Sequence, residues 1–219
     1  MALKAVLFDM DGVLVDTEPL HRKAYFRTFQ DLGIDVSEEL YSTFTGASTK
    51  RVCDTLIRHF EMDVTPEEIT QKKRAFFKDY FYNDEEFDLI PGVRKLIENY
   101  YENGLKLVVA SSASMTTIDM VFEKFGLSQY FLGKISGADL KESKPHPEVF
   151  QLAAKLAGET PENCMVIEDS TNGILASHRA EIFCAAYKSE NTHNQDYSLA
   201  NIVVSDYTEL YLDKIQNHF

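Results

Sequence analysis

An uninterrupted apolar run, Ala5–Phe8, ends abruptly at two aspartates that are separated by one residue. Such a run suits a strand buried on both faces of a parallel sheet, and ligands bind where such strands end. Asp9 and Asp11, two positions apart on extended chain, are expected on one face. Two carboxylates so close raise each other's proton affinity unless a cation lies between them. Such a pair is therefore suited to binding a metal ion and to transferring a proton. For this motif alone, a turn in which both side chains accept backbone hydrogen bonds is an equal alternative.

The character of the sequence changes twice along the chain. Residues 17–86 show apolar side chains at helical spacing only, including a capping box at Thr65–Glu68. From Leu89 onwards, short apolar strands, one of them expected at Tyr130–Ile135, alternate with helices. We therefore expect an α/β fold: a Rossmann-like, doubly wound parallel sheet in residues 1–16 and 87–219, with a helical domain inserted at 17–86. An insertion directly after the first strand is expected above the edge that carries Asp9.

The composition narrows the class of protein. The net charge of −13 argues against nucleic acid and anionic membranes as partners, and we interpret it as a contribution to solubility. Three cysteines without a CxxC pair fit a reducing cytosol. The first strand begins almost at once, which leaves no room for a signal peptide, and no apolar run approaches the ~20 residues of a membrane span. We expect a cytoplasmic protein, and a monomer.

Three further polar segments follow the aspartate pair. Ser111 and Ser112 end an apolar strand and can offer hydroxyl and backbone N–H groups to an anion, although capping of the next helix is the favoured interpretation of these serines alone. Lys144 precedes Pro145, which excludes it from a helix and leaves a compact cation on a rigid connector. Without further context, a solvated loop lysine is the simpler interpretation.

The last segment places Glu168 and Asp169 at the end of another apolar strand. Together with Asp9, these carboxylates would form an oxygen-rich site for Mg²⁺. Capping of the following helix by Asp169 or Ser170 is the alternative.

Taken in this order, the segments FDMDGVLVDTE, VVASS, KPHP and EDSTNGI resemble the four motifs of the haloacid dehalogenase (HAD) superfamily. The resemblance covers nearly the whole chain and is to the subfamily of β-phosphoglucomutase-like enzymes and phosphatases with an α-helical cap domain. It implies that Asp9 is the nucleophile that takes the phosphoryl group and that Asp11 is the general acid and base. It also implies that Ser111 binds the phosphoryl group and that Lys144 neutralises its charge.

The same resemblance implies a Mg²⁺ cofactor. Asp9, the backbone carbonyl of Asp11, and Asp169 would hold the ion, with Glu168 as a ligand or as a partner through water. The expected substrate is a small phosphate ester, a sugar phosphate above all, hydrolysed through an aspartyl phosphate.

The acceptor of the phosphoryl group separates a phosphatase from a β-phosphoglucomutase-type mutase. Thr49 aligns with the position where the mutase has an arginine for the distal phosphate, so we favour the phosphatase and keep the mutase as the alternative. The candidate substrate-binding residues are His21, Gly46, Ser48, Lys50 and Ser112. The chain departs from the family at Glu181, where a glycine commonly relieves a left-handed backbone, which leaves the geometry of that turn open.

Overall fold

The structure is a computed structural model, and it describes residues 2–44, 49–189 and 194–219. The chain divides into two compact units. The core unit consists of the chain up to Asp16 together with Asp88–Phe219, and the helical unit consists of Thr17–Phe87. No described helix has both the length and the apolar character that a membrane crossing requires.

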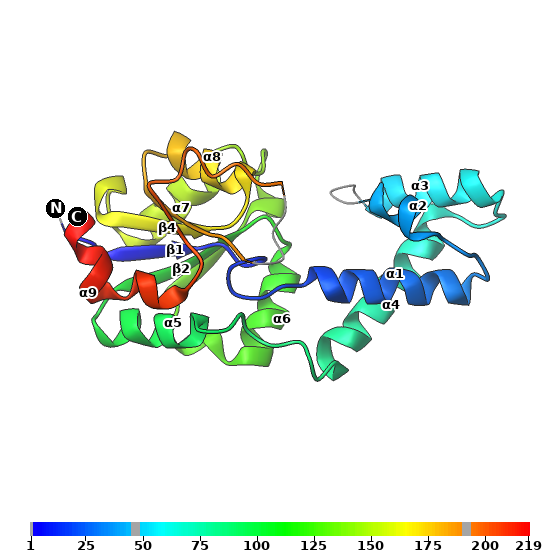
Figure 1. Cartoon of the computed structure of the whole chain (residues 1–219), viewed down its shortest axis with the longest axis horizontal. Helices are drawn as coiled ribbons and strands as arrows, with labels where there is room; N and C mark the ends of the chain where they lie inside the picture. The colour runs from blue at the N-terminus through cyan, green and yellow to red at the C-terminus, as the bar shows by residue number, and fades with distance from the viewer. Residues whose placement is uncertain (1, 45–48, 190–193) are drawn as a thin grey trace. The chain divides into compact units, whose positions relative to one another are not determined.

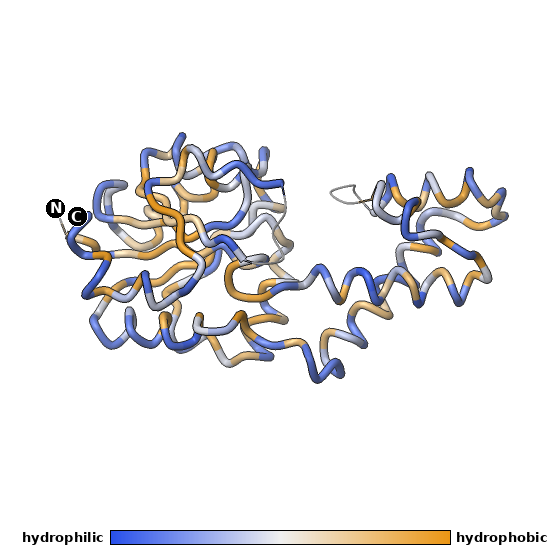
Figure 2. Tube along the Cα trace, in the orientation of Figure 1, coloured by the Kyte–Doolittle hydropathy of each residue, from blue (hydrophilic) through white to orange (hydrophobic). Residues whose placement is uncertain are grey.

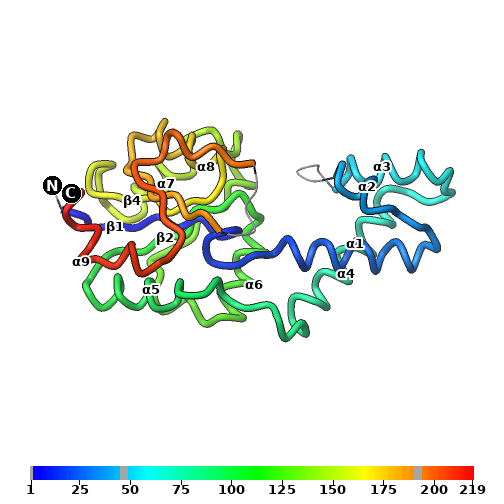
Figure 3. The backbone as a smooth tube through the Cα atoms, in the orientation of Figure 1, coloured from blue at the N-terminus to red at the C-terminus, as the bar shows by residue number. Residues whose placement is uncertain are grey.

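A six-stranded parallel sheet forms the centre of the core unit, in the order β3-β2-β1-β4-β5-β6. The N-terminal strand β1 lies between β2 and β4, as Figure 3 shows. Every residue of β1 is buried, in agreement with its unbroken apolar run. The α/β class with a parallel sheet is therefore confirmed. The strands are β1 (Ala5–Phe8), β2 (Lys106–Ser111), β3 (Gly133–Ser136), β4 (Cys164–Glu168), β5 (Phe183–Tyr187) and β6 (Ile202–Val204).

Helices cover both faces of this sheet. Figure 1 shows α5 (Val93–Glu102) and α6 (Met115–Phe125) on one face, and α7 (Glu148–Ala157) and α8 (Thr171–Arg179) on the other. Hydrophobic residues gather along the strands between these layers (Figure 2). The remaining elements are short: α9 (Leu212–Ile215) and the 3₁₀ turns η1 (Leu127–Gln129), η2 (Gly137–Asp139), η3 (Pro161–Asn163), η4 (Tyr207–Leu210) and η5 (Gln216–His218).

The third strand begins later than its apolar pattern predicts. Tyr130 closes the 3₁₀ turn η1 by donating its backbone N–H to the carbonyl oxygen of Leu127. Phe131 is buried and packs edge-on against Phe8. Both apolar residues therefore serve the packing of a turn, and β3 starts only at Gly133.

The helical unit comprises α1 (Glu18–Asp31), α2 (Glu38–Ser42), α3 (Thr49–Phe60) and α4 (Pro66–Asn83). Its own core is largely aromatic, with Tyr25 and Phe29 of α1 packed against Leu56 of α3. The predicted capping box starts α4: Thr65 accepts from the backbone N–H of Glu68, whose carboxylate accepts from the backbone N–H of Thr65. The helical character of this segment therefore follows from local signals.

The chain leaves and re-enters the core unit through two paired segments. Val15 and Leu89 form an isolated antiparallel bridge, and the backbone N–H of Ile90 donates to the carbonyl oxygen of Leu14 over 2.9 Å. The insertion thus begins and ends at one place in the core unit.

Candidate active site

The register of the parallel strands brings the acidic motifs to one edge of the sheet. Phe8 of β1 is level with Ile167 of β4, so Asp9 and Glu168, the next residues, are also level. Phe8 is likewise level with Val109 of β2, so Ser111 ends its strand at the same edge. Residues that are more than a hundred positions apart in sequence therefore meet where three strands end.

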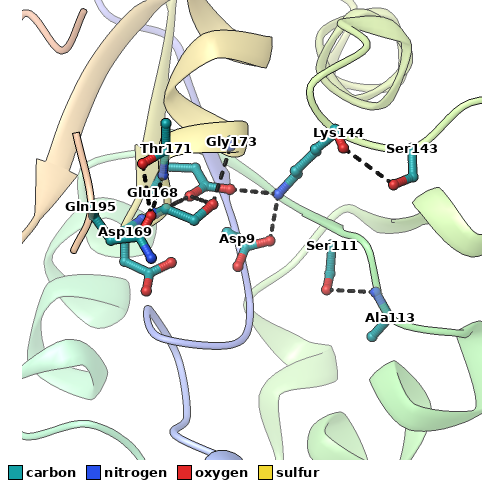
Figure 4. Close-up of polar contacts among 11 residues, drawn as sticks. Asp9, Ser111, Ala113, Ser143, Lys144, Glu168, Asp169, Thr171, Gly173 and Gln195 are labelled. Carbon is teal, nitrogen blue, oxygen red and sulfur yellow. Dashed lines mark hydrogen bonds and ion pairs between the residues drawn. The ribbon is translucent and has the colours of Figure 1, made fainter. Parts of the chain in front are cut away.

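Lys144 joins two of these carboxylates (Figure 4). Its Nζ atom lies 2.5 Å from Oδ1 of Asp9 and 2.8 Å from Oε1 of Glu168. Its side chain is only 5% exposed and lies over the ring of Phe150 in α7. Burial alone would lower the pKa of Lys144, but the charges of Asp9 and Glu168 raise it, so the ammonium stays charged. The geometry therefore excludes the interpretation of Lys144 as a solvated loop residue.

Glu168 is hydrogen-bonded on both carboxylate oxygens. Oε1 accepts from Lys144, while Oε2 accepts from the backbone N–H groups of Asp169 and Ser170 and from the Ser170 hydroxyl. A Cβ atom at Gly173 would lie 1.6 Å from Oε1 of Glu168, so only glycine leaves room for this carboxylate. Glu168 thus orients Lys144 and fixes the first turn of α8.

Asp169, in contrast, has a carboxylate that accepts no hydrogen bond in the part of the chain that the structure describes. It lies against Gly12, where an added Cβ atom would be 2.1 Å from Oδ2 of Asp169. Burial, followed by the charges of Glu168 and Asp9, raises the pKa of Asp169 to about 8. The capping role that the sequence left open for Asp169 belongs to Ser170, whose hydroxyl accepts from the backbone N–H of Gly173.

These carboxylates fit a hard cation. Asp9, Glu168 and Asp169 each offer a carboxylate oxygen, and the three oxygens lie within 4.8 Å of one another. Among the described residues, these three acids share the ammonium of Lys144, and none of those residues donates a hydrogen bond to the carboxylate of Asp169. Carboxylate oxygens are the ligands that Mg²⁺ prefers, so the chemistry of the donor set suits this ion.

Asp9 and Asp11 differ in their surroundings. Asp9 is buried, and burial raises its pKa, although the charge of Lys144 opposes the shift. Asp11 is only half-buried in the loop after β1, where the N–H of Gly12 donates to the carbonyl oxygen of Val15. Gly12 has a φ of 81°, a conformation that favours glycine. One carboxylate is therefore fixed in the charge cluster while the other lies at its rim.

The serines at the end of β2 are not helix caps. Ser114 caps α6 by accepting from the backbone N–H of Thr117. Ser111 is 2% exposed, and its Oγ atom accepts from the backbone N–H of Ala113, which leaves the hydroxyl proton available to an anion. Ser112 is exposed.

The helical unit holds the other candidate residues. Nδ1 of His21 lies 2.8 Å from Nζ of Lys73, and the imidazole stacks on Phe77. Burial and the charge of Lys73 lower the pKa of His21 to about 4, and burial lowers the pKa of Lys73 to about 8. Lys50 is exposed in the first turn of α3, while Gly46 and Ser48 lie outside the described residues.

Lys73 is a buried basic residue that the sequence analysis does not single out. A signal for its burial exists, since it lies four positions after Ile69 and four before Phe77, on the apolar side of α4.

The turn after α8 keeps a left-handed backbone despite its glutamate. Glu181 has a φ of 58°, and its backbone N–H donates to the carbonyl oxygen of His178. A residue with a Cβ atom is strained in this region, by about 1–2 kcal/mol. Glu181 therefore adopts the backbone conformation that a glycine would adopt, and this lowers the stability of the folded protein.

A comparison with known families identifies the family of this chain. Residues 6–187 match the family of haloacid dehalogenase-like hydrolases. The chain belongs to this family.

Two of the similar proteins have names that state an activity. Hexitol phosphatase B of Escherichia coli K12 is 32% identical over 209 residues, which cover 94% of this chain and 93% of that protein. A solved structure of β-phosphoglucomutase from Clostridium difficile is 27% identical, with a TM-score of 0.74 over 98% of this chain and 96% of that one. CbbY from Rhodobacter sphaeroides, solved with phosphate, is also 27% identical, with a TM-score of 0.78 over 95% and 96% of the two chains.

The chain also matches a segment of a longer protein. It is 32% identical over 193 residues to SUPPRESSOR OF QUENCHING 1 of Arabidopsis thaliana, and the match spans 85% of this chain but only 18% of that protein.

Proposed function

We propose that this protein is a Mg²⁺-dependent phosphatase that hydrolyses small phosphorylated metabolites, sugar phosphates above all, through an aspartyl phosphate. One observation carries the proposal: the buried Asp9 carboxylate is held by Lys144 at the sheet edge, beside a second carboxylate, Asp169, to which no described residue donates a hydrogen bond. A structural ion pair alone does not account for the excess of acid at this edge. The name of the hexitol phosphatase relative supports the same reaction class.

Asp9 is the nucleophile in this proposal. One of its oxygens is bound by Lys144, so the carboxylate is fixed in place and is screened against the charge of a phosphate monoester. Attack of the other oxygen on phosphorus forms the aspartyl phosphate while the bond to the leaving oxygen breaks. The hydroxyl of Ser111 and the Lys144 ammonium bind the phosphoryl oxygens as charge redistributes.

Asp11 is the general acid and base. Its half-buried position at the rim of the cluster leaves it accessible to a leaving group and then to water. It protonates the leaving alkoxide and later removes a proton from the attacking water.

The residues that would hold Mg²⁺ are Asp9 and Asp169, with the backbone carbonyl of Asp11 as a third ligand. When bound, the ion polarises the phosphoryl group and offsets the negative charge around the nucleophile. Because both oxygens of Glu168 are hydrogen-bonded to protein donors, we assign Glu168 the role of holding Lys144 and of reaching the ion through water.

The helical unit has the role of a cap domain in this proposal. Its candidate substrate contacts are His21, Lys50, Gly46 and Ser48, and Lys73 joins them as the partner of His21. In the core unit, Ser112 is a separate candidate for contact with the substrate.

Release of inorganic phosphate tests the proposal directly. The wild-type protein is expected to hydrolyse p-nitrophenyl phosphate and sugar phosphates with Mg²⁺, whereas Asp9→Asn should release no phosphate because an amide is a poor nucleophile. The variant should still fold, since it has one buried negative charge fewer, and a circular dichroism spectrum checks this. Undiminished turnover by a folded Asp9→Asn protein would remove Asp9 as the nucleophile.

A mutase of the β-phosphoglucomutase type is the second candidate, and the likeness to that enzyme's structure favours it. Thr49, at the start of α3, has no guanidinium with which to bind a distal phosphate. Loss of one charged hydrogen-bonded contact of ~1.5–3 kcal/mol would weaken binding of a bisphosphate by about 10- to 100-fold. With β-glucose 1-phosphate and glucose 1,6-bisphosphate, we expect free phosphate to form faster than glucose 6-phosphate. The opposite ratio would establish the mutase.

A further inference from the structure

Tyr197 has a buried hydroxyl group for which the described chain provides no hydrogen-bond partner. Its ring packs against the core cluster that includes Val166 of β4 and Ile174 of α8. Buried polar groups without a partner are uncommon, and such a group points to an interaction with water or an ion. The proposed activity leaves this phenol without a role.

The segment that carries Tyr197 is attached close to Asp169. Oε1 of Gln195 accepts from the backbone N–H of Thr171 over 2.7 Å and from its hydroxyl over 2.8 Å. The backbone N–H of Asp196 donates to the Thr171 hydroxyl over 2.8 Å. Figure 4 shows Gln195 and Thr171 beside Asp169. Tyr197 thus follows a segment fixed to a residue two positions from a candidate metal ligand.

The two groups complement each other chemically. Within the described chain, the hydroxyl of Tyr197 is a donor without an acceptor, and the carboxylate of Asp169 is an acceptor without a donor. Burial, followed by the negative charge of Asp169, raises the pKa of Tyr197, so the phenol keeps its proton and feels the charge of this carboxylate. No direct hydrogen bond joins them, so a contact between them requires a bridging water, and a water with two or more polar partners is a stable bridge.

We propose that Tyr197 is a positioning residue for the cation site, whose hydroxyl donates through one ordered water to the carboxylate of Asp169. The inference rests on the proposed function, which makes Asp169 a metal ligand. A donor on one carboxylate oxygen fixes the rotation of the group and leaves the other oxygen for the ion. Outer partners of this kind tune the affinity of a metal site.

Tyr197→Phe separates this role from a structural one. Mg²⁺ alone, titrated calorimetrically into metal-free protein, should bind the variant with a dissociation constant about three- to tenfold higher, the effect of one hydrogen bond. The melting temperature of the metal-free variant should stay the same or rise, because the change removes a buried hydroxyl that has no partner. A tyrosine that serves packing alone would leave Mg²⁺ affinity unchanged.

Two tyrosines of α5 provide matched controls. Tyr101 is exposed, and Tyr101→Phe should change neither quantity. The buried hydroxyl of Tyr100 donates to the carbonyl oxygen of Leu210, so Tyr100→Phe should lower the melting temperature by about 2–4 °C and leave Mg²⁺ affinity unchanged.

Each outcome of these measurements either supports or overturns the inference. Weaker Mg²⁺ binding by Tyr197→Phe at unchanged or higher stability supports the inference. Unchanged affinity in this variant, while the wild type binds Mg²⁺, overturns the inference and leaves the proposed function standing. A lower melting temperature of the metal-free variant also overturns it, because the hydroxyl then has a structural partner. Absence of Mg²⁺ binding by the wild type overturns both the metal assignment and the inference.

Discussion

Substitution of Lys144 by methionine isolates the energetic role of the buried ammonium. Methionine keeps an unbranched apolar side chain over Phe150 but leaves Asp9 and Glu168 without their shared cation. Removing one partner of a buried ion pair costs about 3–5 kcal/mol, because the remaining charge stays buried and unpaired. We therefore expect Lys144→Met to lower the free energy of unfolding of the metal-free protein by about this amount at pH 8.

The loss should depend on pH with a definite sign. Asp9 has a raised pKa in the folded protein, and the charge of Lys144 limits the rise, so removing Lys144 raises that pKa further. A carboxyl group with a raised pKa contributes stability that is present below the pKa of the unfolded chain and is lost as the pH rises through the folded value. Lys144→Met should therefore lose less stability at pH 5, where its carboxyl groups take up protons, than at pH 8.

Urea denaturation of metal-free protein at the two pH values measures both effects. Lys106→Met is the matched control, since Nζ of Lys106 lies 2.7 Å from Oε1 of Glu159 but its side chain is 44% exposed. Exposed pairs contribute about 1 kcal/mol or less, so the control should lose little at either pH. Equal losses in the two lysine variants, or a loss in Lys144→Met that does not change with pH, would refute the reasoning.

Three further predictions follow from the geometry. Gly12→Ala should weaken Mg²⁺ binding and reduce turnover because the new methyl group collides with the Asp169 carboxylate. Gly33 also has a left-handed backbone but open space around it, so Gly33→Ala should affect stability alone. Calorimetry and a phosphate-release assay compare the two variants. Excess EDTA should abolish turnover and Mg²⁺ should restore it, while Ca²⁺ should inhibit because its larger, more flexible coordination misplaces Asp9; activity that persists in EDTA would contradict the metal assignment. Glu181→Gly should raise the free energy of unfolding by about 1 kcal/mol by relieving the left-handed strain, with Asn103→Gly, whose φ is negative, as the control.

The sheet and its acidic edge could be predicted because their signals lie in continuous stretches of sequence. The strands β1, β2 and β4 contain apolar runs, and Asp9, Ser111 and Glu168 stand where these runs end, so these strands and their polar ends follow from local pattern. The start of β3 did not follow, because Tyr130 and Phe131 are as apolar as strand residues but pack in a turn.

The sequence could not predict which residue of each motif caps a helix and which residue is left for another role. Ser114 rather than Ser111 caps α6, and Ser170 rather than Asp169 caps α8, and the backbone angles that decide this are not visible in the residue types. The double pairing of Lys144 depends on residues 135 and 24 positions away. The hydroxyl of Tyr197 gains significance only because it is buried and has no partner among the residues that the structure describes, which no sequence pattern records.

The bridge between Val15 and Leu89 has a consequence for how the helical unit is attached to the core unit. Since the chain leaves the sheet and returns to it at one bridged pair, we expect a different insertion between these positions to leave the order of the strands unchanged. By the same logic, we expect the core unit to keep its own fold when a short glycine-serine linker replaces the stretch between Asp16 and Asp88.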